Sequence, residues 1–244
     1  MIKEISVTNL FGNLNVAITI NGNNAILTAP NGCGKTTILK MIDACARNNI
    51  NYLQRVPFDT FHITFDDGDD IILNNHDTFT IIKGLQSTKD ILLIDQCQRN
   101  ELVFNTRDIN FKTHFAMLKE LYEPLLFEPV AKQLVVKDNK LAIVYKDNTY
   151  DINILSDGEY HMLNILYNII FRTASDSIVL VDEPETGLHI EVQESYIDCL
   201  DKIIASKKDL QIISATHSPN IINGYLQYLC KKKMSFSDIV ESND

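Results

Sequence analysis

Hydrophobic and polar residues alternate along the first twenty positions of the chain. The apolar members of this alternation are Ile5, Val7, Leu14, Val16, Ile18 and Ile20. Residues 9–13 interrupt the pattern with two asparagines and a glycine, which are common turn residues. A period of two is expected for half-buried strands, so we predict an antiparallel hairpin at the N-terminus.

A short apolar run at residues 25–27 precedes a glycine-containing stretch and then a segment with a different period. In that segment the apolar residues are Ile38, Leu39, Met41, Ile42 and Cys45. These positions follow the 3.6-residue repeat of an amphipathic helix. The order predicts a buried strand, a glycine loop and a helix over residues 35–47.

Short alternating segments follow an irregular stretch that runs to Asp59. The expected strands are residues 61–65, 71–73, 79–82 and 91–94, with the first two paired and the last two paired. Four aspartates stand between the first two strands. They lack the downstream spacing and the glutamate of an EF-hand, so we interpret them as a solvated hairpin tip and not as a calcium loop.

The second half of the chain predicts helices and strands of both kinds. Residues 111–127 carry one apolar helical face, and a meander follows with expected strands at residues 134–136, 141–145 and 150–154. A helix is predicted after Ser156. The apolar runs at residues 178–181 and 210–215 are typical of strands that are buried on both faces.

These elements predict an α/β fold with a mixed or parallel core sheet, an antiparallel β lobe and an inserted segment. The 244 residues fit one domain, 1–244. We assign its core to residues 1–50 and 150–225. The insertion is expected at about 50–150 and includes the helix at 111–127, which we interpret as a lid helix.

Composition places the chain among globular proteins. Hydrophobic residues make up 45% of it, and the mean hydropathy is −0.05. No apolar run approaches the roughly 20 residues that span a bilayer, and residues 1–4 lack the apolar core of a signal peptide. We therefore expect a cytoplasmic protein without a membrane association. The cysteines are scattered and form no C-x-x-C pair, which argues against a disulfide framework or a zinc site.

The formal net charge is −10. Proteins that bind nucleic acid tightly usually carry a basic excess, so the charge gives no support to nucleic acid as a partner. Residues 231–233 are three consecutive lysines, which we interpret as a solvated helix end. A local basic groove stays open as an alternative, and nucleic acid therefore stays open as a partner.

The loop before the helix at 35–47 has the composition of a phosphate-binding loop. Its predicted nucleotide contacts are Asn31, Gly32, Cys33, Gly34, Lys35, Thr36 and Thr37. Backbone N–H groups of such a loop, together with the helix N-terminus, bind the phosphates of ATP. The lysine reaches the β- and γ-phosphates, and the Thr36 hydroxyl is expected to bind Mg²⁺.

Three details of this region carry alternatives. Ala29 stands where the strict pattern G-x-x-x-x-G-K-[ST] has glycine, which would cost roughly 1 kcal/mol if that position needs φ > 0. Cys33 is either a small residue in a variable slot or a redox-sensitive thiol at a helix N-terminus. Phe11 is either a packed turn residue or a ring that stacks on adenine.

Two carboxylates end the buried strand at 178–181. Functional sites of parallel sheets lie at the carboxyl ends of the strands, so Asp182 and Glu183 are expected in the site. We predict that Asp182 binds the Mg²⁺ shell and that Glu183 polarises the attacking water. His217 follows the next buried strand, where we predict a sensor of the γ-phosphate.

Ser156 and Glu159 have the spacing of a capping box at a helix N-terminus, and Gly158 lies between them. The four motifs occur in the order Walker A, signature, Walker B with a following glutamate, and switch histidine. This order resembles the ABC-type ATPase superfamily. The sequence DEPETGLH at 182–189 and the sequence ATHSP at 215–219 are similar to the OLD-type and SMC/RecF-like branch, whose ATPases belong to DNA repair and phage defence.

The resemblance covers residues 1–50 and 150–225 and implies a mechanism. Two heads dimerise head-to-tail, and each ATP lies between the phosphate loop of one copy and the signature of the other. Ser156, the Gly158 N–H and Glu159 would then contact the ATP of the partner copy, and residues 185–189 would cross the interface. The metal-loop glutamine of the family has no unique counterpart here, and the candidates are Gln54, Gln86, Gln96 and Gln98.

Three functions follow from these patterns. The first is an ATPase subunit that gates or drives a separate effector, such as a nuclease or a toxin, since 27 residues after His217 are too few for the Toprim nuclease of OLD-type chains. The second is the ATP-binding subunit of a membrane transporter, which the signature and residues 185–189 do not favour. The third is a nucleotide-dependent scaffold or sensor with little turnover.

Overall fold

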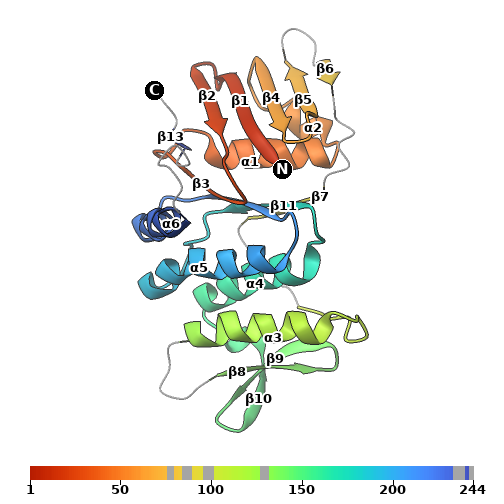
Figure 1. The fold of residues 1–244 in the computed structure, drawn as a ribbon, viewed down its shortest axis with the longest axis vertical. Coiled ribbons are helices and arrows are strands. Elements are labelled where there is room, and N and C mark those ends of the chain that lie inside the picture. Colours follow the sequence, from red (N-terminus) through yellow and green to blue (C-terminus); the bar gives the residue numbers. More distant parts are fainter. Residues whose placement is uncertain (76–79, 84–89, 96–101, 127–131, 233–239, 242–244) are drawn as a thin grey trace.

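The computed structural model describes residues 1–75, 80–83, 90–95, 102–126, 132–232 and 240–241 (Figure 1). Its elements form stacked layers along the long axis of the molecule. An antiparallel sheet lies at one end, a parallel sheet crosses the middle, and a small three-stranded sheet lies at the other end. Helices fill the spaces between these sheets.

The antiparallel sheet holds the first part of the chain. Its order is β2 (Leu14–Thr19), β1 (Ile2–Leu10), β4 (Thr60–Phe65), β5 (Asp70–Asn74) and β6 (Thr80–Lys83). The predicted N-terminal hairpin and the hairpin around the aspartates are both confirmed. The predicted pairing of residues 79–82 with 91–94 is wrong, because β6 pairs with β5 instead, and Phe79 lies outside the described residues.

The middle sheet is parallel and has the order β13 (Val240–Glu241), β3 (Asn24–Thr28), β12 (Gln211–Ala215), β11 (Ser177–Asp182) and β7 (Asp90–Ile94). Three of its strands, β3, β11 and β12, are buried on both faces, as their apolar runs predict. Along β11, Ile178 and Leu180 pack into one hydrophobic cluster, and Val179 and Val181 pack into the other. Successive side chains of a strand point to opposite faces, so the middle sheet separates the hydrophobic core into two clusters.

Helices of different origin cover the two faces of the middle sheet. Helix α1 (Lys35–Ala46) packs between it and the antiparallel sheet, and the one-turn helix α2 (Ile50–Leu53) lies in the stretch predicted to be irregular. The helices on the opposite face are α4 (Asp157–Arg172), α5 (Ile190–Ser206) and α6 (Pro219–Lys232). In the part of the chain that the structure describes, no helix combines the length and the apolar character needed to cross a membrane.

The segment that precedes α4 in the sequence forms a separate layer, on the side of α4 that faces away from the middle sheet (Figure 1). Helix α3 (Phe111–Tyr122) is followed by a 3₁₀ turn (Glu123–Leu125), and Pro124 explains why the α-helix is shorter than the predicted 111–127. The meander is confirmed as β8 (Gln133–Lys137), β9 (Lys140–Tyr145) and β10 (Asn148–Asp151). The predicted end of its last strand is wrong, because Ile152–Ile154 forms a 3₁₀ turn whose N-cap is the side chain of Asp151. Strands β4 to β7 pair within the other two sheets, so among the described residues between β4 and α4 the segment that departs from these sheets begins at about residue 102 and ends at about 154.

One glutamine joins the two large sheets. The side-chain oxygen of Gln211 accepts a hydrogen bond from the Ile2 N–H (2.7 Å), and its amide nitrogen donates to the Ile2 carbonyl (2.9 Å). Gln211 is 1% exposed. Both ends of its amide group are therefore paired, and the start of β1 is fixed to the start of β12.

Candidate functional site

The phosphate loop (residues 29–36) connects β3 to α1 at the carboxyl edge of the middle sheet. Gly32 (φ 86°) and Gly34 (φ 81°) both have left-handed backbones, which glycine adopts at little cost. A Cβ on Gly34 would lie 2.7 Å from Leu10 Cδ2, so a residue with a side chain at this position would also crowd Leu10. Ala29 has no positive φ, so the strain that its substitution for glycine would have caused is absent.

Lys35 begins α1 and its side chain folds back over the loop. Its Nζ donates to the carbonyl of Ala29 (2.6 Å) and to that of Pro30 (3.1 Å). Burial lowers the pKa of Lys35, and the nearby charges of Asp182 and Glu183 partly oppose this effect. Around Gly32, no atom lies within 4 Å of where a Cβ would be. An open loop with backbone turns and an ammonium group fits a phosphate chain.

Thr36 and Asp182 meet at the foot of this loop. The Thr36 hydroxyl donates to Asp182 Oδ1 (3.1 Å), which joins the first turn of α1 to the end of β11. Burial raises the pKa of the Asp182 carboxyl, and the charge of Glu183 adds to this rise. A divalent cation would favour the ionised carboxylate. Two adjacent protein oxygens fit Mg²⁺, which usually completes its shell with phosphate oxygens and water.

Glu183 directly follows β11 with a left-handed backbone, at φ 49°. Its N–H donates to the Ala215 carbonyl at the end of β12 (2.9 Å). Left-handed backbones are uncommon for residues other than glycine and cost roughly 1–3 kcal/mol. The neighbouring strand therefore holds Glu183 in a strained conformation beside Asp182.

His217 lies just beyond β12, and Glu185 fixes its position. The Glu185 carboxylate accepts hydrogen bonds from the Thr216 hydroxyl (2.7 Å) and from the His217 N–H (2.7 Å). These bonds join the ends of β11 and β12, which pair in parallel with Asp182 opposite Ala215. The structure thus brings the ends of both strands to the same edge as the phosphate loop.

The signature segment (residues 155–159) begins α4. The capping box is confirmed, because the Ser156 hydroxyl accepts from the Glu159 N–H (3.3 Å) and the Glu159 carboxylate accepts from the Ser156 N–H (2.7 Å). A side chain on Gly158 would overlap the carbonyl oxygen of Gly187. The signature segment therefore packs backbone against backbone on the crossing segment (residues 185–189), where Gly187 has φ 72°.

Glu159 is held by the layer beyond α4. Its carboxylate forms an ion pair with Lys132 (2.8 Å), and its backbone carbonyl accepts from the Tyr122 hydroxyl (3.0 Å). Burial opposes the ionisation of Glu159, but the hydrogen bonds from Lys132 and Ser156 outweigh it, so the pKa of Glu159 is lowered. These contacts tie α3 and the start of β8 to the first turn of α4.

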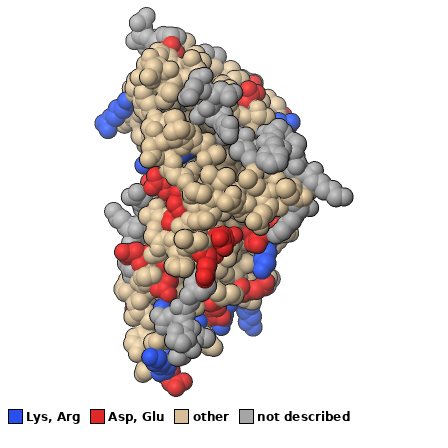
Figure 2. All heavy atoms as spheres, turned by 90° about the vertical axis from the view of Figure 1, so that its left-hand side faces the viewer, with Lys and Arg blue, Asp and Glu red and all other residues tan. Residues whose placement is uncertain are grey.

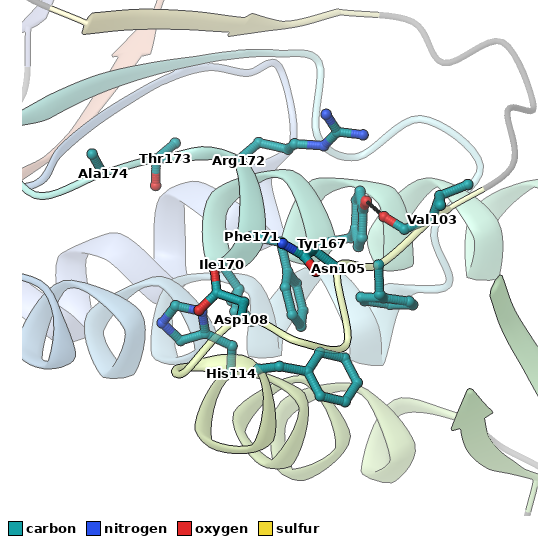
Figure 3. Close-up of a pocket in the computed structure, with 12 residues that line it drawn as sticks. Val103, Asn105, Asp108, His114, Tyr167, Ile170, Phe171, Arg172, Thr173 and Ala174 are labelled. Carbon is teal, nitrogen blue, oxygen red and sulfur yellow. Dashed lines mark hydrogen bonds between the residues drawn. The ribbon is translucent and has the colours of Figure 1, made fainter. Parts of the chain in front are cut away.

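Two cavities lie near opposite ends of α4. A pocket of about 210 Å³ adjoins the signature segment and the crossing segment. A larger one of about 740 Å³ lies near the C-terminal end of α4, against α3 and the chain before it (Figure 3). Figure 3 shows Asp108 and His114 side by side in it, and Phe171 facing them from α4. Burial lowers the pKa of His114, the charge of Lys207 adds to this, and Asp108 opposes it.

Lys207 closes the C-terminal end of α4. Its Nζ lies 2.7–2.9 Å from four oxygens, which are the carbonyls of Ile169, Ile170 and Thr173 and the Thr173 hydroxyl. Burial lowers the pKa of Lys207 to about 8. The last carbonyls of a helix have no N–H donor within the helix, and this ammonium group donates to them instead.

The remaining predictions fall outside the site or outside the described residues. Phe11 is 46% exposed and lies beside the phosphate loop, with its Cε2 3.5 Å from where a Gly34 Cβ would be. Gln54 ends α2, whereas Gln86, Gln96 and Gln98 lie outside the described residues. Cys33, Cys45, Cys199 and Cys230 form no disulfides, and Cys97 lies outside the described residues.

Sequence patterns missed three residues of this region. Glu185 accepts from the Thr216 hydroxyl just after β12, Lys132 pairs with Glu159, and His161 is buried in α4. Only Glu185 had a signal, because it follows the strand that ends in Asp182. Asp95 follows β7 at the position opposite Asp182, where its charge further raises the pKa of Asp182.

Known proteins with this architecture include ATPase heads. Residues 162–222 match the sequence profile of a family described as "AAA ATPase domain". The fold is similar to the SMC head domain from Thermotoga maritima, with a TM-score of 0.58 and 13% identity over 91% of each chain. It is also similar to a protein from Pyrococcus furiosus described as the ATP-binding protein of an ABC transporter, with a TM-score of 0.52 and 14% identity over 98% of each chain. No curated protein matches the sequence significantly.

These likenesses define the class of fold. The chain has the α/β fold of P-loop NTPases in the form shared by SMC heads and ABC-type ATP-binding proteins. The predicted fold class is thereby confirmed. The sequence match from α4 to the start of α6 agrees with this class.

Proposed function

We propose that this protein is an ATPase that binds ATP and Mg²⁺ at the phosphate loop and hydrolyses ATP between two copies of the chain. The observation that carries the proposal is the contact between Thr36 and Asp182 directly below the loop, with Glu183 next in sequence. In this reading Lys35 binds the β- and γ-phosphates, and Thr36 and Asp182 hold the metal. Glu183 is the general base for water, and His217 contacts the γ-phosphate.

The remaining loop residues have simpler roles. Backbone N–H groups of residues 31–37 surround the phosphates, so Asn31, Cys33 and Thr37 contribute through their main chain. Mg²⁺, when bound, neutralises charge on the transferred phosphoryl group. Phe11 lies beside the loop and is half exposed, a position from which its ring can meet the adenine. Backbone donors and fixed charges stabilise the developing negative charge of the transition state.

A second copy of the chain would complete the site. Helix α1 and the signature helix α4 pack on opposite faces of the middle sheet, so one chain has its phosphate loop and its Ser156 in different layers (Figure 1). Ser156 and Gly158 present a helix N-terminus, which suits the γ-phosphate of the partner copy. Large apolar side chains next to the signature and crossing segments, Ile154 (42%) and Ile190 (56%), are exposed, as residues of an interface would be in one copy.

Complementation between two inactive variants tests this arrangement. Lys35→Ala removes the phosphate contact of a copy, and Ser156→Arg blocks its signature. Each variant alone should show no turnover. A mixture of the two should regain ATPase activity, because Lys35 of one copy and Ser156 of the other form an intact site. If the mixture stays inactive while wild-type protein is active, the site does not form between copies.

Two single variants separate binding from turnover. Glu183→Gln should retain ATP and shift the protein to a dimer in light scattering with ATP and Mg²⁺, since the base is lost and the phosphate contacts remain. Lys35→Ala should abolish ATP binding in calorimetry. Glu183→Gln that stays monomeric with bound ATP would contradict the dimer, and Lys35→Ala with unchanged affinity would contradict the phosphate loop.

We further propose that ATP turnover gates a separate effector protein in DNA repair or anti-phage defence. The crossing segment (residues 185–189) and the sequence ATHSP at 215–219 support this role, because they resemble the OLD-type and SMC/RecF-like ATPases of DNA repair and phage defence. Known SMC heads have been solved with a domain of ScpA bound, so a head of this fold can carry a protein partner. Figure 2 shows acidic side chains gathered at mid-height on one face, with basic side chains apart from one another. Among the residues drawn in colour, that face shows no continuous basic band for nucleic acid, which favours a protein effector.

A transporter subunit is the second candidate. The similarity to an ABC transporter's ATP-binding protein over 98% of both chains favours it. Co-purification from the native host separates the candidates, because a transporter subunit brings membrane-spanning partners and an effector-gating head brings a water-soluble enzyme. ATP turnover below detection together with tight ATP binding would instead support a scaffold or sensor.

A further inference from the structure

The first turn of α4 carries negative charge at the place where the proposed function puts the partner's γ-phosphate. Its acidic residues are Asp157 and Glu159. The Glu159 Oε2 atom accepts the Ser156 N–H at 2.7 Å, so this carboxylate lies next to the residue that is proposed to meet the phosphate. The N–H groups of a helix N-terminus attract a phosphate, but a carboxylate at the same place repels it. The signature segment therefore needs positive charge beside Glu159 if it is to bind ATP.

Lys132 supplies that positive charge. Its Nζ lies 2.8 Å from Glu159 Oε1, while Oε2 keeps the capping bond to Ser156. The Lys132 side chain is only 8% exposed, and lysine is almost never buried without a charged partner. Burial alone would raise the pKa of Glu159, but the hydrogen bonds from Lys132 and Ser156 lower it, so the carboxylate is charged at neutral pH.

This ammonium group comes from a different layer from the phosphate loop. Lys132 directly precedes β8, and the Leu134 N–H in β8 donates to the Glu123 carboxylate just after α3 (2.7 Å). Tyr122 of α3 is fully buried and donates its hydroxyl to the Glu159 carbonyl (3.0 Å). The layer of α3 and β8 therefore holds Lys132 against the signature segment, whereas α1 and the middle sheet hold the phosphate loop.

We propose that Lys132 neutralises Glu159 and thereby allows the signature segment to bind the γ-phosphate of the partner copy. This inference rests on the proposed function, in which Ser156 and Gly158 meet that phosphate. Lys132 acts through Glu159 and does not touch the nucleotide, so it is a positioning residue. With the ion pair formed, the carboxylate caps α4 without repelling the phosphate. Without Lys132, the same carboxylate stands unbalanced beside the phosphate and weakens the ATP-dependent pairing of the two copies.

The dimer that ATP is expected to form gives the first test. Variants are made in the Glu183→Gln background, and the dimer Kd with ATP and Mg²⁺ is measured by analytical ultracentrifugation. Lys132→Met keeps a long side chain and removes the charge. We expect it to raise the dimer Kd by roughly 10- to 100-fold and to leave ATP binding by the monomer unchanged. An unchanged dimer Kd would overturn the proposal.

Removal of the partner charge separates compensation from a brace between the two layers. Glu159→Gln weakens the same ion pair, but the glutamine oxygen can still accept the Ser156 N–H. Since this variant leaves no carboxylate to balance, we expect its dimer to be at least as tight as that of Glu183→Gln alone. A brace would be lost in Glu159→Gln as well as in Lys132→Met, so equal weakening by both substitutions would also overturn the proposal.

Combining the two substitutions gives a rescue test. Lys132→Met with Glu159→Gln replaces the ion pair by neutral side chains of similar length, a change that proteins often tolerate. The combined variant should dimerise as tightly as Glu159→Gln. A weaker dimer would show that Lys132 acts by some route other than the charge of Glu159. This comparison does not require Lys132→Met to fold on its own.

Lys119→Met is the matched control. It removes the same charge from the same layer, where Lys119 pairs with Glu123 at 3.4 Å, and it should leave the dimer Kd unchanged. A loss equal to that of Lys132→Met would overturn the specific link to Glu159. The background variant separates the two levels of the argument. If Glu183→Gln binds ATP and remains a monomer, the proposed function itself is contradicted, whereas a dimer that Lys132→Met leaves intact overturns only this inference.

Discussion

The N-terminal and C-terminal ends of α4 differ in what fixes them. At the N-terminal end Gly158 packs directly against the backbone of Gly187, and a few polar bonds around Ser156 and Glu159 complete the contact. At the C-terminal end Lys207 supplies the hydrogen bonds, and a group of aromatic rings supplies the packing. These rings are Phe104, Phe111, Phe115, Tyr167 and Phe171.

The two ends of α4 therefore differ in how much structural change they tolerate. A backbone contact leaves no room for an added atom, so the end that is proposed to meet the partner's ATP is fixed within narrow limits. Rings in edge and stacked contacts can adjust, because each ring touches several others. Phe104, for example, has ring contacts with four neighbours. We therefore expect substitutions at the N-terminal end to act sharply and those at the C-terminal end to be absorbed more easily.

The largest effect is expected for Gly158→Ala. The added methyl would overlap the Gly187 carbonyl oxygen, and backbone would have to move on both sides. We expect the free energy of unfolding to fall by about 3 kcal/mol, as measured by denaturant titration. Gly224→Ala is the matched control, because Gly224 is also helical but its nearest atom, the Glu194 carbonyl oxygen, lies 3.4 Å away. Equal stability of the two variants would remove the basis of the comparison.

Lys207→Met tests the C-terminal end. It keeps a long side chain and removes the ammonium group, so the carbonyls of Ile169, Ile170 and Thr173 lose a charged donor. We expect a loss of about 2 kcal/mol in the free energy of unfolding at pH 7.

The free energies of unfolding of wild-type protein and Lys207→Met, measured against pH, give an independent check. The pKa of Lys207 is about 8 in the folded protein and 10.5 ordinarily. Between these values the unfolded chain binds more protons than the folded one, so the free energy of unfolding rises with pH. Wild-type protein should therefore gain stability relative to Lys207→Met from about pH 8 to 10.5. A constant difference across that window would contradict the lowered pKa.

Glu159→Gln should have a smaller effect. It weakens the bond to Lys132 and the capping bond to Ser156, and we expect about 1 kcal/mol at neutral pH. Because the pKa of Glu159 is lowered, its contribution is present above 4.5 and is lost as the pH falls through the folded value. Thermal melts of both proteins should therefore converge in acid. Glu191→Gln, an exposed glutamate in the first turn of α5, is the control and should show less of this convergence.

Arg172→Ala should have the smallest effect. Its guanidinium lies 5.7 Å from the centre of the Tyr167 ring and the residue is exposed, so we expect a loss of about 0.5 kcal/mol in denaturant titration. A loss as large as that of Gly158→Ala would show that the C-terminal end is fixed as narrowly as the other end.

The sequence predicted the local parts of the fold better than the distant pairings. The phosphate loop and the capping box were predictable, because Gly32, Gly34, Ser156 and Glu159 act within a few residues of themselves. The segments β6 and β7 were predicted as strands, but their partners are set by sheets formed from other parts of the chain. Periodicity reports which residues are buried and does not report which strand lies alongside.

The site shows the same limit. Asp182 and Glu183 were expected at a strand end, and the structure brings Thr36 to Asp182 as a bonded neighbour. The pairing of Gly158 with Gly187 could not be predicted, because each glycine alone is compatible with an ordinary turn or helix start. His161 had no signal either, since a histidine among apolar helical positions is indistinguishable from a core residue until its neighbour across the interior is known.

The position of β3 has a consequence for biosynthesis. This strand carries the phosphate loop, yet its neighbours in the sheet, β12 and β13, leave the ribosome far later. Pairings between distant segments form slowly and only after both are available. A nascent chain therefore carries its glycine loop without the neighbouring strands during most of translation, and truncated products that stop before β12 should not bind nucleotide at the proposed site.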